Sequence, residues 1–242
     1  MHYFIGTSGY NYPEWRGSFY PEKFPTSKML AFYAERFNTV EVNYTFYRMP
    51  TPPLLEGWAA GTPEAFAFTL KAPRRITHDS KLQHVEDLTQ TFCRTAATLG
   101  SKLGALLFQL PPTFKKDVAV LRDFVDLLPD GTRAAFEFRH PSWFVPEIYA
   151  FLRQHDAALV IGDTPERKFQ PHELTAGWTF LRFHYGSRGR GGNYSDRELD
   201  EWAARIDAWR RSGIDVYAYF NNDWEGYAIR NALGLKERLG VA

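Results

Sequence analysis

The strongest constraint on this chain is a repeated pattern of short apolar segments that end in charged or amide side chains. Because side chains alternate across a β-strand, residues two apart share a face. Glu137 and Arg139 therefore share one face of their segment, whereas Phe136 and Phe138 occupy the other. The other polar side chains that fall on the corresponding faces are Glu41, Asn43, Lys71, Gln109, Asp163, Arg182, His184 and Asn221. An apolar face under helices and a polar face that converges are typical of a parallel barrel, which builds its site at the C-terminal ends of its strands.

The alternation of strand and helix patterns predicts one TIM-type (β/α)8 barrel over residues 1–242. Eight apolar runs predict strands that begin near Tyr3, Thr39, Phe66, Leu103, Arg133, Ala158, Thr179 and Asp215. Helical patterns run from Ser27 to Phe37, Glu86 to Leu99, Asp117 to Leu128, Pro146 to His155, Ser195 to Ser212 and Gly226 to Leu239. Such alternation implies parallel pairing with right-handed crossovers, and about 250 residues suit a closed α/β barrel.

Two segments depart from an ideal barrel. The link after the second strand leaves room only for a short helix around Leu54 to Ala60, and the stretch from Thr164 to Gly177 after the sixth strand leaves little room for any. The rival fold is a doubly wound open sheet. Its glycine-rich fingerprint should lead directly into a helix, but the glycines of Gly6 to Gly9 lead into an aromatic loop, which favours the barrel.

Composition excludes some classes of protein. The formal net charge is +1, so no broad basic surface for nucleic acid is expected. Cys93 is the only cysteine, so no intrachain disulfide can form. The N-terminus does not resemble a signal peptide, and no apolar run approaches the roughly 18 residues that span a bilayer. We therefore expect a cytoplasmic protein that has no membrane partner.

A set of motifs distributed along nearly the whole chain resembles the YecE-like family (domain of unknown function family 72). The matching segments are Gly6 to Tyr10, Trp15, Phe19 to Pro21, Phe37 to Asn43, Phe46-Tyr47, Lys71 to Pro73, Ile76 to His78, Leu99-Gly100, Leu103-Gly104, Gln109 to Pro112, Phe136 to His140, Ser142-Trp143, Asp163, Arg182 to His184 and Tyr219 to Asp223. The resemblance implies a TIM-type barrel and implies no particular reaction.

The charged strand-end residues favour acid–base chemistry. The inward face is predicted to hold Glu41, Glu137 and Asp163 against Lys71, Arg139 and Arg182, three charges of each sign. Unbalanced charge in a low-dielectric cavity is costly, so the balance fits a buried site. Our hypothesis is that Glu137, beside Arg139, is ionised and acts as a base, whereas Glu41, between valines, acts as an acid. The alternative is a structural salt-bridge network that fills the barrel.

The cations favour an anionic substrate. Arginine presents a planar fork that suits carboxylate or phosphate, and Lys71, Arg139 and Arg182 are the candidates. Arg188 and Arg190 lie in a glycine-rich loop after the seventh strand, where such barrels often bind phosphate. The alternative for this loop is a surface lid with solvated arginines.

Other side chains are candidates for positioning the substrate. Asn43, Gln109, His184 and Asn221 would contact hydroxyl groups, with His184 as a hydrogen-bonding wall residue or proton carrier. His78 would protonate a leaving group or contact phosphate, unless it merely faces solvent. Aromatic rings in the C-terminal loops would stack on the substrate, unless they pack in the core; the candidates are Tyr12, Trp15 and Trp143.

No cofactor is expected. Glu41, Glu137, Asp163 and His184 are residue types that hold Mg, Mn or Zn, so a divalent metal is the weaker alternative. Arg139 and Arg182 beside them would repel a cation.

The sequence thus favours an enzyme of the isomerase, lyase or hydrolase type. Its substrate would be small and anionic or sugar-like, bearing phosphate or carboxylate. One alternative is a barrel that binds or processes nucleic acid, with arginines on phosphates and rings on bases. Another is a non-catalytic protein that binds a metabolite. Neither the substrate nor the oligomeric state follows from the sequence.

Overall fold

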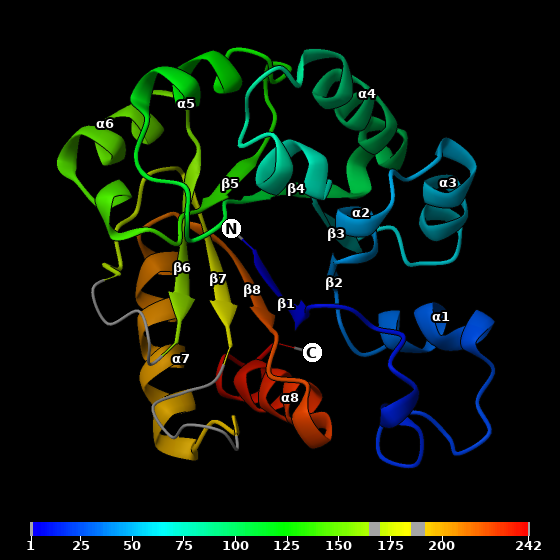
Figure 1. Ribbon diagram of the computed structural model, residues 1–242. Helices are drawn as coiled ribbons and strands as arrows, with labels where there is room; N and C mark the ends of the chain where they lie inside the picture. The colour runs from blue at the N-terminus through cyan, green and yellow to red at the C-terminus, as the bar shows by residue number, and fades with distance from the viewer. Residues whose placement is uncertain (1, 165–169, 185–191, 242) are drawn as a thin grey trace.

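A computed structural model describes residues 2–164, 170–184 and 192–241. The parallel strands form the barrel, and helices surround it (Figure 1). Every strand begins within one residue of its predicted start. The strands are β1 Tyr3–Thr7, β2 Thr39–Val42, β3 Ala67–Lys71, β4 Leu103–Gln109, β5 Ala134–Glu137, β6 Ala158–Asp163, β7 Trp178–Phe183 and β8 Asp215–Phe220. The prediction of a TIM-type (β/α)8 barrel is confirmed.

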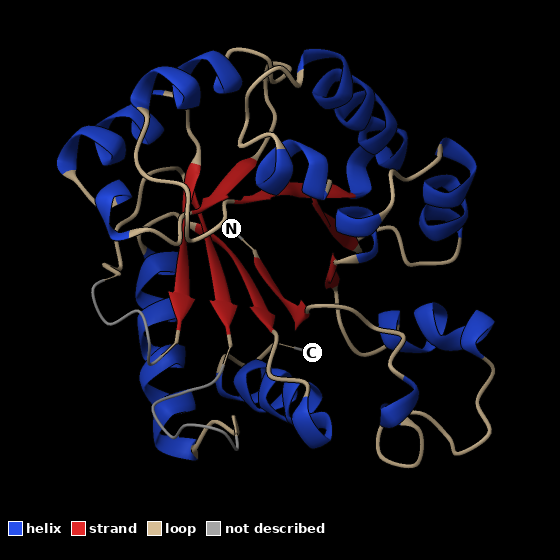
Figure 2. Ribbon diagram, in the orientation of Figure 1, coloured by secondary structure: helices blue, strands red, loops and turns tan. Residues whose placement is uncertain are grey.

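The helices follow the predicted segments closely and form the outer layer (Figure 2). The α-helices are α1 Met29–Ala34, α2 Tyr44–Tyr47, α3 Pro52–Ala60, α4 Glu86–Ala96, α5 Val118–Val125, α6 Pro146–Gln154, α7 Asp196–Arg211 and α8 Tyr227–Arg238. Short helical turns of other types are η1 Pro13–Trp15, η2 Thr26–Lys28, η3 Arg75–Asp79, η4 Ala97–Lys102, η5 Pro141–Trp143 and η8 Trp224–Gly226.

The two predicted irregularities are present. After β2 the chain forms only the four residues of α2 and the nine of α3. After β6, residues 164 and 170–177, the described part of the link to β7, contain no helix. The helix predicted from Ser195 begins with a capping box, in which the Ser195 hydroxyl and the Glu198 carboxylate satisfy each other's backbone amides at the start of α7.

The strands pair in parallel in the order β1-β8-β7-β6-β5-β4-β3-β2, which leaves a seam between β1 and β2. Side chains bridge this seam. The Asn38 amide donates to the Tyr3 carbonyl (2.6 Å) and accepts from the Ile5 amide (3.2 Å). At the C-terminal end the Gly9 amide donates to the Glu41 carbonyl (2.7 Å). The barrel therefore closes, but mostly through side chains rather than a strand ladder.

Tyr33 completes the seam and explains a glycine. Its hydroxyl accepts from the Thr7 amide (2.8 Å) and donates to the Thr39 carbonyl (3.1 Å), so it is inserted between the two strands. A Cβ atom at Gly6 would lie 2.2 Å from the Thr39 carbonyl oxygen and 2.8 Å from the Tyr33 hydroxyl. Gly6 is thus required by close approach of backbone and side chain, not by a phosphate-binding turn.

The barrel interior changes character along its axis. At the N-terminal end, Phe4 stacks on Tyr217 at 4.4 Å between ring centroids, and Trp178 meets the same ring edge-on. Higher up, the Tyr219 hydroxyl lies 2.7 Å from the hydroxyls of both Thr39 and Thr69. Above this layer the inward side chains are ionic. The apolar N-terminal end therefore forms a floor beneath a polar mouth.

Candidate functional site

A buried ion cluster lies at the centre of the mouth. The Arg182 guanidinium, from β7, donates two hydrogen bonds to the Glu41 carboxylate of β2, at 2.8 and 2.7 Å. Its third nitrogen donates to Glu137 of β5 at 2.6 Å. The Arg182 side chain is 2% exposed and both carboxylates are 0% exposed. Strands that are far apart in sequence thus meet through one guanidinium, as the alternation of side chains predicted.

Two neighbours complete the coordination of Glu137. The Gln109 amide, at the end of β4, donates to one carboxylate oxygen at 2.7 Å. Arg139, which is 29% exposed, donates to the other at 3.1 Å. Two carboxylates and two guanidiniums therefore balance in charge. The buried part of this network is geometrically fixed, because Arg182, Glu41 and Glu137 are each held by at least two directional hydrogen bonds.

This geometry corrects the predicted division of roles between the two glutamates. Both oxygens of Glu41 accept hydrogen bonds from Arg182, a group that has donors and no acceptor. A proton on Glu41 would displace one of these bonds, so Glu41 is held as the carboxylate and is not the acid in an apolar niche. The flanking valines Val40 and Val42 face the helical layer instead.

Lys71, at the end of β3, is the cation that the cluster does not neutralise. Its ammonium lies 4.2 Å from the centre of the Phe46 ring, and it makes no ion pair with any residue in the described ranges. Burial lowers the pKa of Lys71 to about 8, and the nearby Arg182 charge adds to the effect. Its amine can therefore release a proton near neutral pH.

His78 borders Lys71. The ring packs edge-on against Phe46 at 5.0 Å, and Nδ1 lies 2.9 Å from the Thr77 hydroxyl. Burial lowers the pKa of His78 to about 4, assisted by the positive charges of Lys71 and Arg139. At pH 7 the imidazole is neutral. It is thus a hydrogen-bonding group there rather than an acid or an additional cation.

Asp223, after β8, is an ionisable group of the mouth that was not among the predicted site residues. Burial raises its pKa from 3.8 to about 7, and the negative charge of Glu41 adds to the rise. The N-cap of α8 is Gly226, not Asp223. Its place two residues after Asn221 was the available signal, but its neighbours Tyr12 and Glu41 are far away in sequence.

Tyr12 covers this side of the mouth. Its hydroxyl donates to the Ser8 carbonyl at 2.7 Å. Burial raises its pKa, as does the neighbouring carboxylate of Asp223, followed by Glu41 and Tyr47. The predicted placement of Tyr12 at the mouth therefore agrees with the structure, although it contacts protein groups with its polar end.

The remaining amides and His184 also lie at strand ends. The Asn221 amide nitrogen is 3.2 Å from His184 Nδ1, which joins the ends of β7 and β8. Asn43 is the N-cap residue of α2, but its side chain makes no capping hydrogen bond. Its Oδ1 atom is buried and has no partner among the described residues.

Asp163 does not join the cluster, contrary to prediction. Its carboxylate accepts from the Trp202 indole of α7 at 3.1 Å, so it faces the helical layer. Val160 belongs to the inner apolar group, and alternation from it places Gly162 inward and Asp163 outward. Burial raises the pKa of Asp163, which lies outside the mouth.

Trp15 and Trp143 were predicted to stack on the substrate, and the structure places both in the core. Each is 0% exposed. The Trp143 indole donates to the Phe114 carbonyl at 2.8 Å and stacks on Phe138 at 4.5 Å. Trp15 packs between Tyr12 and Tyr20. Large rings gain more from burial than from exposure at a rim, so the core-packing alternative holds for these two.

Arg188 and Arg190 lie outside the described residues. Within the described ranges, no group of three or more His, Cys, Asp or Glu side chains is arranged to hold a metal ion. The four residues suggested as weaker metal ligands are separated, because Asp163 faces outward and Glu41 and Glu137 hold Arg182.

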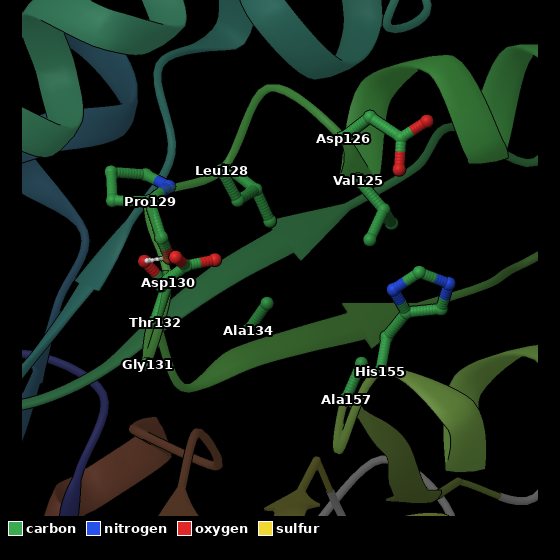
Figure 3. Close-up of a pocket in the computed structure, with 10 residues that line it drawn as sticks. All are labelled: Val125, Asp126, Leu128, Pro129, Asp130, Gly131, Thr132, Ala134, His155 and Ala157. Atoms are coloured by element: carbon green, nitrogen blue, oxygen red, sulfur yellow. Dashed lines mark hydrogen bonds between the residues drawn. The ribbon is translucent and has the colours of Figure 1, made fainter.

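Two hollows lie at the opposite end of the barrel. One, of about 270 Å³, lies between the end of α5 and the starts of β5 and β6, and the His155 ring borders it (Figure 3). Another, of about 600 Å³, is lined by the first residues of β1 and by the C-terminal segment. Neither contains the charged strand-end residues. Barrel enzymes work at the C-terminal face, so the mouth is the candidate site.

In the part of the chain that the structure describes, no helix has the length and apolar character needed to cross a membrane.

A family model described as "Protein of unknown function DUF72" matches residues 4–242. The chain is 28% identical to UPF0759 protein YunF of Bacillus subtilis (strain 168), over 98% of this chain and 95% of that protein. It is 36% identical to UPF0759 protein YecE of Escherichia coli (strain K12), over 46% and 42% of the two chains.

Solved structures agree with these similarities. A DUF72 family protein (TM1631) from Thermotoga maritima MSB8 superposes with a TM-score of 0.86 at 28% identity, covering 99% of this chain and 100% of that one. A D-psicose 3-epimerase from Clostridium cellulolyticum H10 reaches a TM-score of 0.52 at 13% identity, over 99% and 96% of the two chains. The latter likeness concerns the barrel fold alone.

Proposed function

The chain belongs to the DUF72 family, and we propose that it is an enzyme that moves protons on a small anionic, sugar-like substrate at the C-terminal mouth of its barrel. One observation carries the proposal: Lys71 and Asp223, both at the mouth, have pKa values of about 8 and about 7. General acids and bases work best when their pKa lies near the operating pH. Perturbed pKa values of this kind cluster at functional sites.

The two groups have complementary roles near neutral pH. Asp223 is the base, because about half of its carboxyl groups are ionised at pH 7. Lys71 is the acid, because it is mostly protonated below pH 8. The Glu41 carboxylate influences the pKa of both, so it lies near each of them. We therefore assign proton transfer to Lys71 and Asp223. Glu41 and Glu137 supply the negative charges that set the electrostatic environment of these two groups.

The charge balance supports an anionic substrate. Arg182 and Arg139 neutralise the two buried glutamates, which leaves the Lys71 ammonium as excess positive charge. Arg139 is partly exposed, so its free nitrogens can also meet a phosphate or carboxylate. His184 and Asn221 supply hydrogen-bonding groups for hydroxyls on the far side of the cluster. Isomerisation, epimerisation, elimination and hydrolysis all use such proton transfers.

We propose the cytoplasm as the compartment for this activity, because the chain has a lone cysteine and so forms no intrachain disulfide.

The test does not require the substrate to be known. A panel of sugar phosphates, hydroxy acids and keto acids is incubated with the protein in D₂O, and deuterium incorporation is followed by NMR and mass spectrometry. We expect exchange at a carbon next to a carbonyl in at least one compound. Asp223→Asn and Lys71→Met should each reduce its rate by about 100-fold or more.

Arg211→Met is the control for loss of a positive charge, since Arg211 is 69% exposed at the end of α7, on the face opposite the mouth. It should leave the exchange rate unchanged. If panel compounds stabilise the wild type but not Lys71→Met, and none is exchanged or converted, the protein is a metabolite-binding protein and not an enzyme.

A nucleic-acid-binding barrel is the second candidate, and one observation favours it. Tyr44 and Tyr47, on α2 beside the mouth, are 44% and 80% exposed, and Arg74 and Arg75 lie at the start of η3 nearby. Exposed rings stack on bases, and arginines hold phosphates. Binding of a fluorescent single-stranded oligonucleotide that weakens with salt and in Tyr47→Ala would support this function. Absence of binding at low salt would exclude it.

A further inference from the structure

Three polar oxygen atoms at the mouth are buried and have no hydrogen-bond partner among the described residues. They are the Ser8 hydroxyl after β1, Asn43 Oδ1 after β2 and Asp223 Oδ1 after β8. These three strands are neighbours around the barrel, since β8 pairs with β1 and β1 meets β2 at the seam. Unpartnered polar atoms occur elsewhere, but this is a group on adjoining strand ends.

Tyr12 indicates that the strand ends carrying these atoms lie close together. Its hydroxyl contacts the Ser8 carbonyl, and the charges that act on it come from Asp223 and Glu41. Tyr47, four residues after Asn43, is a further neighbour. Ser8 also pairs with Glu41 in an isolated parallel bridge. The ends of β1, β2 and β8 therefore converge around the Tyr12 hydroxyl.

Tyr12 cannot satisfy all three atoms. Its hydroxyl has one proton, and it interacts with both the Ser8 carbonyl and the Asp223 carboxylate. Asn43 makes no capping hydrogen bond to α2. A buried oxygen without a partner costs free energy, and such atoms call for an explanation that includes a missing ligand.

We propose that Ser8, Asn43 and Asp223 form a subsite for the hydroxyl groups of the substrate, an inference that rests on the proposed function. Two of the three atoms are pure acceptors when Asp223 is ionised, so the ligand must bring donors. Hydroxyls on neighbouring carbons supply several donors in a small space. The Ser8 hydroxyl can accept from one of them and donate to another.

This assignment orients the substrate. The cationic side of the mouth, with Lys71 and Arg139, takes the phosphate or carboxylate. The side formed by Ser8, Asn43 and Asp223 takes the polyhydroxylated end. The Glu41–Arg182–Glu137 cluster lies between the two sides, because Glu41 influences Lys71, Tyr12 and Asp223 alike. The substrate class is therefore a phosphorylated or carboxylated sugar, with the reacting carbons over the ion cluster.

The test uses two matched pairs of probes in isothermal titration calorimetry. Ethyl phosphate is compared with sorbitol 6-phosphate, and propionate with gluconate, so that each pair differs in hydroxyl groups and not in the kind of anion. For the wild type we expect the hydroxylated member of at least one pair to bind about tenfold more tightly or better. Ser8→Ala and Asn43→Ala should abolish most of this gain and leave the Kd of the simple anion within about twofold.

Two further variants separate this subsite from the anion site and from general effects of mutation. Lys71→Met should weaken both members of a pair alike. Thr89→Val removes an unpartnered buried hydroxyl in α4 and should change neither Kd. Because Ser8→Ala removes a polar atom that has no partner, it should also raise the Tm of the ligand-free protein by about one to a few degrees.

Three results would overturn the inference. Equal affinity for both members of each pair in the wild type would mean that fixed water alone satisfies these atoms, and the proposed function would stand. A rise in Tm with Mg²⁺, Ca²⁺ or K⁺ alone, lost in Ser8→Ala, would make the group a cation site. Absence of binding by every probe would exclude the subsite and the anion site together.

Discussion

The two ends of the barrel interior are built on the same strands and use opposite chemistry. β7 contributes Trp178 to the floor and Arg182 to the mouth. The floor consists of stacked rings whose burial stabilises the folded state. The mouth holds buried ions, a lysine with a lowered pKa and unpartnered oxygens. One end of this barrel therefore stabilises the fold, whereas the other holds a prearranged site at a cost in stability.

Ionisation marks the same difference. At the floor, Arg133 is partly exposed and donates to the Tyr217 hydroxyl at 2.8 Å, so its charge keeps contact with water. At the mouth, burial opposes the charged forms of both Lys71 and Asp223. Burying an ion without full compensation is expensive. The mouth is therefore where substitutions should have their largest and most pH-dependent effects.

The largest effect is expected for Arg182→Met. The change leaves Glu41 and Glu137 buried without their shared cation, so the free energy of unfolding should fall by about 3–5 kcal/mol. Urea denaturation measures this loss.

A triple variant, with Arg182→Met, Glu41→Gln and Glu137→Gln together, tests the same explanation even if Arg182→Met alone does not fold. Removing the charges as a set should recover much of the stability. A triple variant less stable than Arg182→Met would contradict the view that the unpaired carboxylates cause the loss.

Asp223→Asn should change the pH dependence of stability. The folded carboxyl has a pKa of about 7 against an ordinary value of 3.8 for aspartate, so between these pH values the folded protein holds a proton that the unfolded chain has lost. The free energy of unfolding therefore falls as the pH rises through this window. Between about pH 4 and about pH 8, wild type should lose roughly 2–4 kcal/mol relative to the variant.

Denaturation at both pH values tests this, with Asp130→Asn, an exposed aspartate, as control for the altered net charge. Parallel curves for wild type and Asp223→Asn would mean that this carboxyl titrates as if it were in solvent.

Tyr219→Phe probes the layer between floor and mouth. Thr39 donates to the Ala67 carbonyl, so Tyr219 donates to Thr39 and accepts from Thr69. Without the tyrosine hydroxyl the Thr69 donor loses its partner, and we expect a loss of about 1–3 kcal/mol. Thermal unfolding of this variant and of Tyr219→Phe with Thr69→Val measures it. The double variant should be the more stable of the two.

Arg133→Met should have the smallest effect. The side chain is 43% exposed and its ion pair with Asp215 spans 3.4 Å, so the loss should be about 1 kcal/mol and come mainly from its hydrogen bond to the Tyr217 hydroxyl. The same denaturation experiment compares it directly with Arg182→Met. A larger loss for Arg133→Met than for Arg182→Met would break the contrast between floor and mouth.

Local pattern in the sequence was enough for the elements and for part of the site. Apolar runs and helix caps depend on neighbouring residues, so strand starts and the Ser195 capping box could be predicted. Alternation along a strand placed Glu137 and Arg182 inward for the same reason. It failed for Asp163 because the parity of a strand must be anchored by knowing which residue faces the interior.

Long-range burial decided what the sequence could not. Trp15 and Trp143 carry no local sign of whether they face the rim or the core. Burial in the folded barrel raises the pKa of Asp223 to about 7, and the charge of Glu41, over 180 residues away, adds to the rise.

By itself, then, the sequence determined that the chain forms an eight-stranded parallel barrel with ionic side chains at one end, since periodicity and capping are local properties. Only the tertiary structure decided which of those charges neutralise one another and which are left to titrate. The reason is physical: a pKa and an unsatisfied hydrogen bond depend on desolvation and on neighbours in space, and both are set when distant strands close around a common axis.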